Sequence, residues 1–180
     1  MIKQAAEFAE LAHKGAFRKG TSIPYITHPL ETAVIVSTLT SDPDLIAAAL
    51  LHDTLEDTET TYEDLESRFG TRVADLVAEE SEDKSKSWKE RKSQTIAHLE
   101  HAGIEIKILT LADKLSNIRS MARDYLLKRE ELWQRFRVKE KSLHAWYYLS
   151  VKERLSELSD TPQYREYEEL CEQVFGRRNL

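Results

Sequence analysis

The strongest chemical signal in the sequence is the run HDTLED at residues 52–57. His52 lies four residues before Glu56, and Asp53 lies four residues before Asp57, so a continuing helix would place the pairs on two adjoining faces. Burial of four ionisable groups without partners would be costly, and a divalent cation with a hydrogen-bond network is the usual compensation. The run therefore predicts a metal site with carboxylates beside it.

Two further segments supply residues of the same chemical type. Asp113 is the one acid of the apolar helical stretch LTLADKLSN, and Asn117 shares its helix face. His28 directly precedes Pro29, which is favoured in the first turn of a helix, so the imidazole can point back toward the core. Two imidazoles and two aspartates suit Mn, Fe or Zn and leave positions for water and substrate. The candidate ligands are His28, His52, Asp53 and Asp113.

Four sequence blocks carry a resemblance to a known family. They are AHKGAFRKG, PYITHPLETA, ALLHDTLEDT and LTLADKLSNIR, and they extend from the first helix to about Met121. The chain resembles the HD-domain phosphohydrolases, and among them the hydrolase domain of the RelA/SpoT alarmone enzymes and the small alarmone hydrolases of the Mesh1 type. The resemblance implies removal of the 3′-pyrophosphate from ppGpp or pppGpp, which gives GDP or GTP and pyrophosphate.

The same resemblance implies a role for individual residues. One Mn²⁺ would be bound by His28, His52, Asp53 and Asp113. Glu56 and Asp57 would act on the water that attacks phosphorus, and Asn117 would help to hold the substrate. The chemistry agrees, because a metal lowers the pKa of bound water and a nearby carboxylate can orient that water or take its proton. One metal is expected, since the HD pair lacks the closely following lysine of HD enzymes that bind two.

Basic and aromatic residues are candidates for substrate contacts. The resemblance implies that Arg18 packs against the guanine and that Lys19 meets phosphate, which suits a planar guanidinium and a point-like ammonium. Tyr25 is the best aromatic candidate for the nucleoside wall, and a core tyrosine with a satisfied hydroxyl is the equal alternative.

A basic segment at residues 84–92 could receive the pyrophosphate end of the substrate, with Lys89 as one of its cations. Arg137, together with Lys141 on the same long helix, could close the other side of the site. For each of these residues a solvated charged face is the competing interpretation.

Helix signals dominate the chain and predict an all-α, single-domain bundle of the HD type over residues 1–180, with a central metal site. The expected helices cover residues 1–15, 29–39, 42 to about 53, 61–69, 71–80, 89–101, 104–121, 128–158 and 164–175. Residues 16–27 and the polar stretch after residue 80 are expected to be loops. The aromatic residues of the long helix at 128–158 are expected in the core.

Composition limits the possible partners. The net charge of −6 argues against general nucleic-acid binding, which depends on many lysine and arginine contacts to phosphates. No stretch approaches the roughly 20 apolar residues of a membrane span. The one cysteine, Cys171, is interpreted as a core residue in a reducing cytoplasm. The sequence leaves the oligomeric state open.

Two alternatives to an enzyme for ppGpp remain at this stage. The first keeps the reaction class and changes the substrate to another phosphorylated nucleotide, such as NADPH or an adenine alarmone. The second is a non-catalytic nucleotide sensor with the same fold, although the residue types for metal binding and catalysis are all present.

Overall fold

The computed structural model describes residues 1–176, and every named element in that range is helical, which confirms the all-α prediction. The α-helices are Ile2–Ala12 (α1), Thr27–Ser37 (α2), Pro43–Leu51 (α3), Thr54–Asp57 (α4), Tyr62–Phe69 (α5), Thr71–Glu80 (α6), Trp88–Leu99 (α7), Ile104–Lys128 (α8), Lys141–Arg154 (α9) and Pro162–Phe175 (α10). Two 3₁₀ helices, η1 and η2, cover Arg129–Arg135 and Ser156–Leu158.

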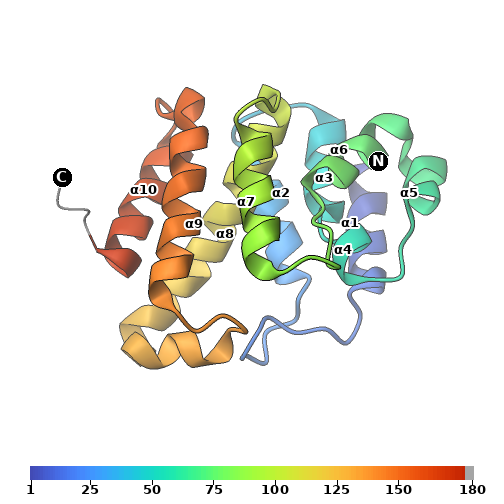
Figure 1. The fold of residues 1–180 in the computed structure, drawn as a ribbon. Helices are drawn as coiled ribbons and strands as arrows, with labels where there is room; N and C mark the ends of the chain where they lie inside the picture. Colours follow the sequence, from blue (N-terminus) through green and yellow to red (C-terminus); the bar gives the residue numbers. More distant parts are fainter. Residues whose placement is uncertain (177–180) are drawn as a thin grey trace.

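The apolar helices α3 and α8 form the centre of the bundle. Helix α3 packs against α1, α2, α6 and α8, and α8 also packs against α2, α6 and α10. Figure 1 shows α9 and α10 on one side of α8, α7 in front of it, and α1, α3 and α5 on the other side. Leu51 of α3 and Leu109 of α8 are fully buried. Polar side chains on these two helices therefore lie in the middle of the molecule.

Several helices begin where side-chain caps predict. Asp42 caps α3 by accepting a hydrogen bond from the Asp44 amide, and Pro43 occupies the first turn. Thr61 opens α5 through a capping box with Asp64. These caps satisfy amides that have no partner within the helix, so they fix the beginning of each element.

The first boundary that differs from prediction lies at the metal motif. Helix α3 ends at Leu51, slightly before the expected end near Asp53, and His52 and Asp53 separate it from the short α4, so the helix does not continue unbroken through residue 57. The Thr54 hydroxyl donates to the Leu51 carbonyl at 2.7 Å, which caps the end of α3 locally. A second difference is that α2 begins at Thr27, so that His28 lies within its first turn.

The C-terminal half also departs from the predicted boundaries. Helix α8 continues to Lys128, and the expected helix over 128–158 is divided into η1, an irregular segment and α9. Arg129 adopts φ 49°, a left-handed conformation that ends α8. The reversal allows Trp133 to pack on His144, with ring centroids 5.3 Å apart. A further difference is at α10, where Pro162 begins the helix that it was expected to precede.

Residues predicted for the core are buried in the structure. Trp133, Tyr147 and Tyr148 are each less than one-tenth exposed, Trp146 is half-buried, and Cys171 is fully buried. Burial raises the pKa of the Cys171 thiol to about 12, which makes it a weak nucleophile. Among residues 1–176, no helix has both the length and the apolar character that a membrane crossing requires.

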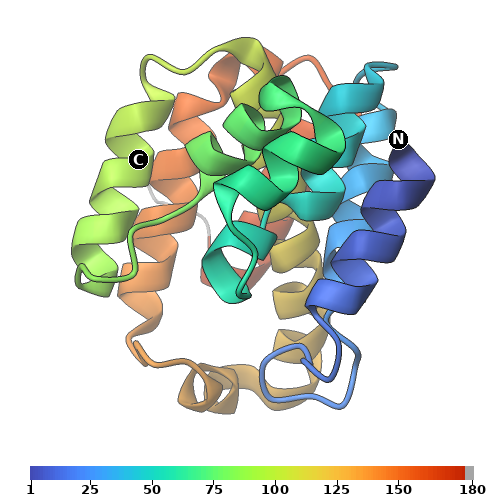
Figure 2. The ribbon, with the colours of Figure 1, turned by 90° about the vertical axis from the view of Figure 1, so that its right-hand side faces the viewer.

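The loop at 13–26 and η1 lie side by side at one end of the bundle (Figure 2). Gly20 has φ 71°, and a Cβ atom built on it would lie 3.2 Å from the Arg135 Cδ atom of η1. The backbone conformation favours glycine, and a larger residue would also require the Arg135 side chain to shift. The contact holds the loop against η1 and shapes the cavity described below.

Candidate functional site

The four residues predicted as metal ligands come together between α2, α3 and α8. His28 Nε2 lies 3.2 Å from His52 Nε2 and 3.1 Å from Asp113 Oδ1. Asp53 Oδ2 lies 3.1 Å from His52 Nε2 and 3.5 Å from His28 Nε2. Donor atoms of His28, His52 and Asp113 all fall within 4.8 Å of one another. Three separate segments thus place nitrogen and oxygen donors around one point.

The outer hydrogen bonds of the two imidazoles determine which ring nitrogen is free. His52 Nδ1 donates to the Ala49 carbonyl at 2.8 Å. The Ser116 hydroxyl donates to Glu31, so it accepts from His28 Nδ1, also at 2.8 Å. Both Nε2 atoms then present lone pairs to each other, which is unfavourable unless a positive charge lies between them. This arrangement fits a divalent cation.

The charges around the imidazoles support the same conclusion. Burial lowers the pKa of His28. At His52 burial also lowers the pKa, but Asp53 and Asp113 outweigh it and raise the pKa to about 10. In the absence of a cation, a proton is therefore held at the His52 ring, and it competes with metal for the same place.

The two aspartates are held by different partners. The Tyr25 hydroxyl donates to Asp53 Oδ2 at 2.5 Å, and the Asn117 amide donates to Asp113 Oδ1 at 2.6 Å. Burial opposes ionisation of Asp113, but Lys114 outweighs it and holds the pKa of that carboxyl well below its usual range. Both carboxylates are thus present in the charged form that binds cations.

Glu56 and Asp57 lie beside this cluster and meet a lysine from the loop between α6 and α7. Lys84 Nζ donates to Asp57 Oδ1 and lies 3.8 Å from Glu56 Oε1. Burial is the largest cause that raises the pKa of Glu56, and Asp53 adds to it. A carboxylate with a raised pKa is suited to accept and return a proton near neutral pH.

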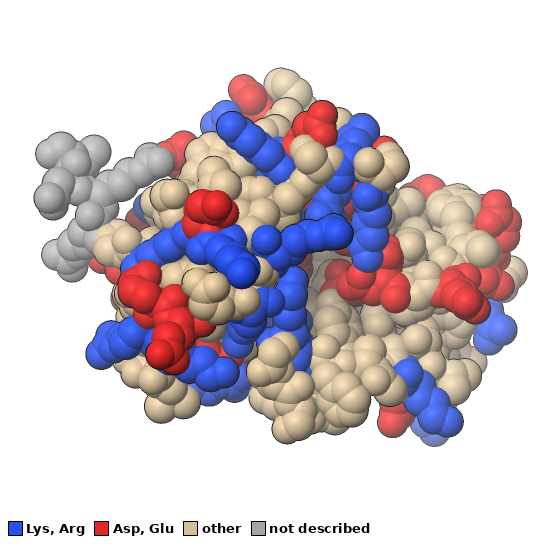
Figure 3. Space-filling model, turned by 60° about the horizontal axis from the view of Figure 1, so that its bottom comes forward, with Lys and Arg blue, Asp and Glu red and all other residues tan. Residues whose placement is uncertain are grey.

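A cavity of about 370 Å³ opens next to the cluster and has the size of a small-ligand site. Its lining residues are Arg18, Lys19, Thr21, Tyr25, Asp57, Asn117, Ser120, Met121, Arg135, Phe136 and Tyr148. Arg18 donates to Asn117 Oδ1 at 2.7 Å, which links the cavity wall to the residue that holds Asp113. Figure 3, turned toward this end of the bundle, shows a hollow with lysine and arginine on one border and acids on another.

The structure separates the predicted substrate contacts into two groups. Arg18, Lys19, Tyr25 and Asn117 line the cavity. Lys89 and Arg137 are exposed and do not line it. Sequence reasoning missed Arg135 as a lining residue, although its position in a basic and aromatic segment next to Arg137 was a weak signal for it.

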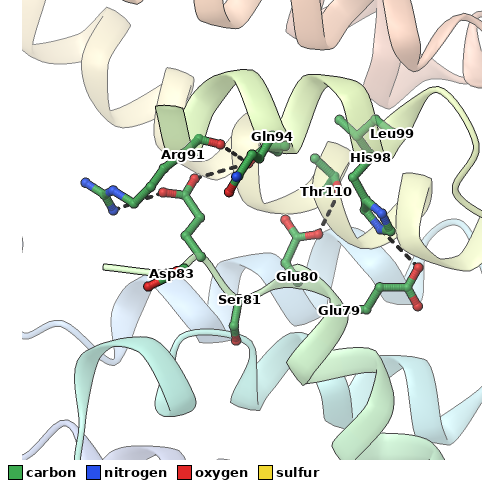
Figure 4. Close-up of a pocket in the computed structure, with 11 residues that line it drawn as sticks. Glu79, Glu80, Ser81, Asp83, Arg91, Gln94, His98, Leu99 and Thr110 are labelled. Carbon is green, nitrogen blue, oxygen red and sulfur yellow. Dashed lines mark hydrogen bonds and ion pairs between the residues drawn. The ribbon is translucent and has the colours of Figure 1, made fainter. Parts of the chain in front are cut away.

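Most cations of the basic segment are already paired within the protein. Arg91 Nη1 and Lys92 Nζ contact the two oxygens of Glu82 at 3.0 and 2.6 Å. Figure 4 shows Arg91 at the edge of a second, smaller pocket of about 210 Å³ between α6 and α7. Two cations of this segment reach the predicted catalytic carboxylates: Lys84 contacts both Asp57 and Glu56, and Arg91 Nη1 also lies 3.8 Å from Glu56 Oε1.

Glu80 points into this second pocket toward α8, where it accepts a hydrogen bond from Thr110 at 2.8 Å (Figure 4). Burial raises the pKa of Glu80 from 4.5 to about 7. Between these pH values the folded state holds a proton that the unfolded state has lost, so stability falls as the pH rises through this window.

We expect Glu80→Gln to raise the Tm of the metal-free protein by a few degrees at pH 8. Each kcal/mol added to the free energy of unfolding raises the Tm on the order of 2–4 °C. The gain should be largely lost at pH 4.5 and vanish below it, where both states carry the protonated acid. Thermal unfolding followed by circular dichroism across this range provides the measurement. Glu79→Gln, at the neighbouring exposed residue, is the control, and an equal gain for Glu80→Gln at both pH values would contradict the argument.

Comparison with known proteins identifies similar chains. Residues 5–152 match the HD domain family. The guanosine-3′,5′-bis(diphosphate) 3′-pyrophosphohydrolase MESH1 of Xenopus tropicalis is 43% identical over 126 residues, which cover 68% of this chain and 70% of the relative. The Homo sapiens MESH1 enzyme is 35% identical over 182 residues, which cover 99% and 95%.

Solved structures are similar over the same range. One is of a metazoan ortholog of SpoT that hydrolyses ppGpp, and it aligns with a TM-score of 0.82 at 27% identity over 98% of this chain and 96% of the other. Another, from Listeria monocytogenes EGD-e, aligns with a TM-score of 0.77 at 34% identity over 83% and 99%. Similarity therefore extends beyond the four motif blocks into the C-terminal helices.

Proposed function

The chain belongs to the HD-domain family, and we propose that it is a metal-dependent 3′-pyrophosphohydrolase of ppGpp and pppGpp. The observation that carries the proposal is the pair of imidazole nitrogens of His28 and His52, 3.2 Å apart and flanked by two aspartates, beside a nucleotide-sized cavity. The MESH1 relatives, which are named for this reaction, support the choice of substrate.

The cation would be held by His28, His52, Asp53 and Asp113, and we propose Mn²⁺, which suits a mixed set of imidazole and carboxylate donors. When bound, it supplies Lewis acidity that lowers the pKa of a water molecule and neutralises charge on phosphate. Neighbouring residues of the chain hold the proposed ligands in position. Hydrogen bonds from Tyr25 and Asn117 fix the rotation of the two aspartates.

Glu56 and Asp57 are proposed to handle the protons of the reaction. The oxygen of water forms a bond to the 3′-linked phosphorus, and the bond from that phosphorus to the ribose 3′-oxygen breaks. One carboxylate takes the proton of the water, and a proton is delivered to the 3′-oxygen, so that GDP or GTP leaves with a 3′-hydroxyl. Lys84, which contacts both carboxylates, is placed to meet the pyrophosphate.

The cavity would hold the nucleoside. Arg18 presents a guanidinium that lies 5.7 Å from the centre of the Tyr25 ring, so a base could stack against this wall. Lys19 and Arg135 border the same cavity and provide positive charge for the 5′-phosphates. We further propose a cytoplasmic location, because free Cys171 is compatible with a reducing compartment.

The proposal is tested by analysing the metal content of the purified protein and then measuring turnover of ppGpp, pppGpp, ppApp and NADPH side by side. We expect Mn²⁺-dependent release of pyrophosphate from the two guanine alarmones, with GDP or GTP as the second product. If NADPH is the one nucleotide of the four that is turned over, with release of orthophosphate, the substrate is NADPH and not an alarmone. A metal-loaded protein that leaves all four nucleotides intact would contradict an enzymatic function.

A further inference from the structure

Lys114 is a buried cation directly beside the proposed metal site, and the reaction outlined above does not use it. It lies on α8 between buried residues, and its side chain is 12% exposed. Its ammonium group donates to Asp113 Oδ2. The other oxygen of this carboxylate, Oδ1, faces His28 Nε2 at 3.1 Å and accepts from Asn117. The two oxygens of Asp113 therefore have separate partners.

The surroundings of Lys114 explain why a charge is retained at this depth. Glu80 and Glu82, at the end of α6, both attract the ammonium group, and it lies 5.8 Å from the centre of the Tyr147 ring. Glu82 is also bound by Arg91 and Lys92. For Glu80, by contrast, the attraction to Lys114 is the largest charge interaction that favours ionisation. One ammonium group thus offsets both Glu80 and Asp113.

We propose that Lys114 is a positioning residue for the metal site: it holds Asp113 Oδ2 and leaves Oδ1 as the single oxygen offered to the cation. The inference depends on the proposed metal site and extends it to a residue outside the ligand set. Adjacent positions on a helix point in different directions, yet the long lysine side chain reaches the carboxylate of its neighbour. Lys114 therefore acts on the cation through Asp113.

Loss of the ammonium group removes two constraints together. The Asp113 carboxylate becomes free to rotate, and the repulsion between Asp113 and Glu80 is no longer offset. Loss of a group that orients a metal ligand typically weakens metal binding 10- to 100-fold. We therefore expect Lys114→Met to weaken Mn²⁺ binding by roughly this factor, and Lys114→Arg, which retains the charge, to recover most of the affinity.

Lys107 provides a matched control on the same helix. Its side chain is 6% exposed, and its ammonium group donates to Glu157, outside the metal cluster. Lys107→Met thus removes an equally buried, acid-paired lysine from α8. The experiment is a calorimetric titration of the full-length, metal-free protein and its three variants with Mn²⁺, and circular dichroism of each variant establishes that it is folded.

The expected result is a weakened Mn²⁺ affinity for Lys114→Met, restored affinity for Lys114→Arg, and unchanged affinity for Lys107→Met. Equal affinity of wild type and Lys114→Met overturns the inference while leaving the metal site intact. Equal weakening in Lys107→Met also overturns it, because the effect would then be a general loss of packing. If Lys114→Met does not fold, the folded Lys114→Gln variant replaces it in the titration. Equal Mn²⁺ affinity of wild type and Lys114→Gln then overturns the inference in the same way. A wild type that binds no Mn²⁺ overturns both this inference and the proposed function.

Discussion

Replacing His52 by alanine should abolish ppGpp hydrolysis and Mn²⁺ binding together. The His52 ring is fixed by its hydrogen bond to the Ala49 carbonyl and presents Nε2 to His28 and Asp53. Its removal deletes one of the four proposed ligands. It also leaves a gap between the remaining donors where the imidazole ring was. Metal content measured by atomic absorption, together with the rate of pyrophosphate release, provides the readout.

His98→Ala is the matched control for this prediction. His98 lies on α7 with its side chain 45% exposed and pairs with Glu79, on the wall of the second pocket. We expect this variant to retain wild-type metal content and turnover. If His52→Ala keeps both properties, the proposed metal centre is wrong. If it keeps the metal and loses only turnover, His52 is not a ligand and has another role in the reaction.

Replacing Glu56 by glutamine should reduce kcat by roughly 10²–10⁴-fold and leave the metal content unchanged. Glutamine keeps the shape of the side chain and removes its ability to accept a proton. Because the pKa of Glu56 is raised, mainly by burial, the base becomes active only as the pH rises through a value above its ordinary 4.5. The wild-type rate should increase with pH over this range, and the variant should lack this increase.

The control is Glu66→Gln, an exposed residue of α5 that accepts a hydrogen bond from Thr71. Steady-state rates at saturating ppGpp, measured from pH 5 to pH 9, compare the three proteins. A Glu56→Gln variant with near-normal kcat would exclude Glu56 as the proton acceptor and would leave Asp57 as the candidate. A fall in KM and kcat together with metal loss would instead indicate a structural role.

The site could be predicted to the extent that its chemistry is local in sequence. Buried polar residues such as Asp113, in an apolar helical stretch, stand out because an unpaired charge is costly there. The structure places side-chain atoms of His28, His52, Asp53 and Asp113 near one another, and their role as metal ligands stays a prediction. The family prediction is confirmed by the match to the HD domain, and the helical class by the described residues.

Features that depend on tertiary contacts were not predictable from the sequence. Spacing alone does not decide whether the helix continues through residues 52–57, and the structure ends it at Leu51, whose carbonyl accepts a local hydrogen bond from the Thr54 hydroxyl. The contact between Lys84 and Asp57 joins residues 27 positions apart in the sequence, and Lys84 lies in a polar loop that has no periodic signal. The division of the segment at 128–158 follows from the packing of Trp133, which overrides helix propensity.

The contacts from Arg18 through Asn117 to Asp113 connect the wall of the proposed nucleotide cavity with the proposed metal site. An occupant that draws the guanidinium of Arg18 away removes one of the two hydrogen bonds that hold the Asn117 amide, whose nitrogen donates to Asp113. Affinity for nucleotide and affinity for cation are then linked, and thermodynamic reciprocity requires each to alter the other by the same factor. Truncation of Asn117 to alanine would uncouple the two equilibria, so that saturating nucleotide no longer changes how strongly the ion is held.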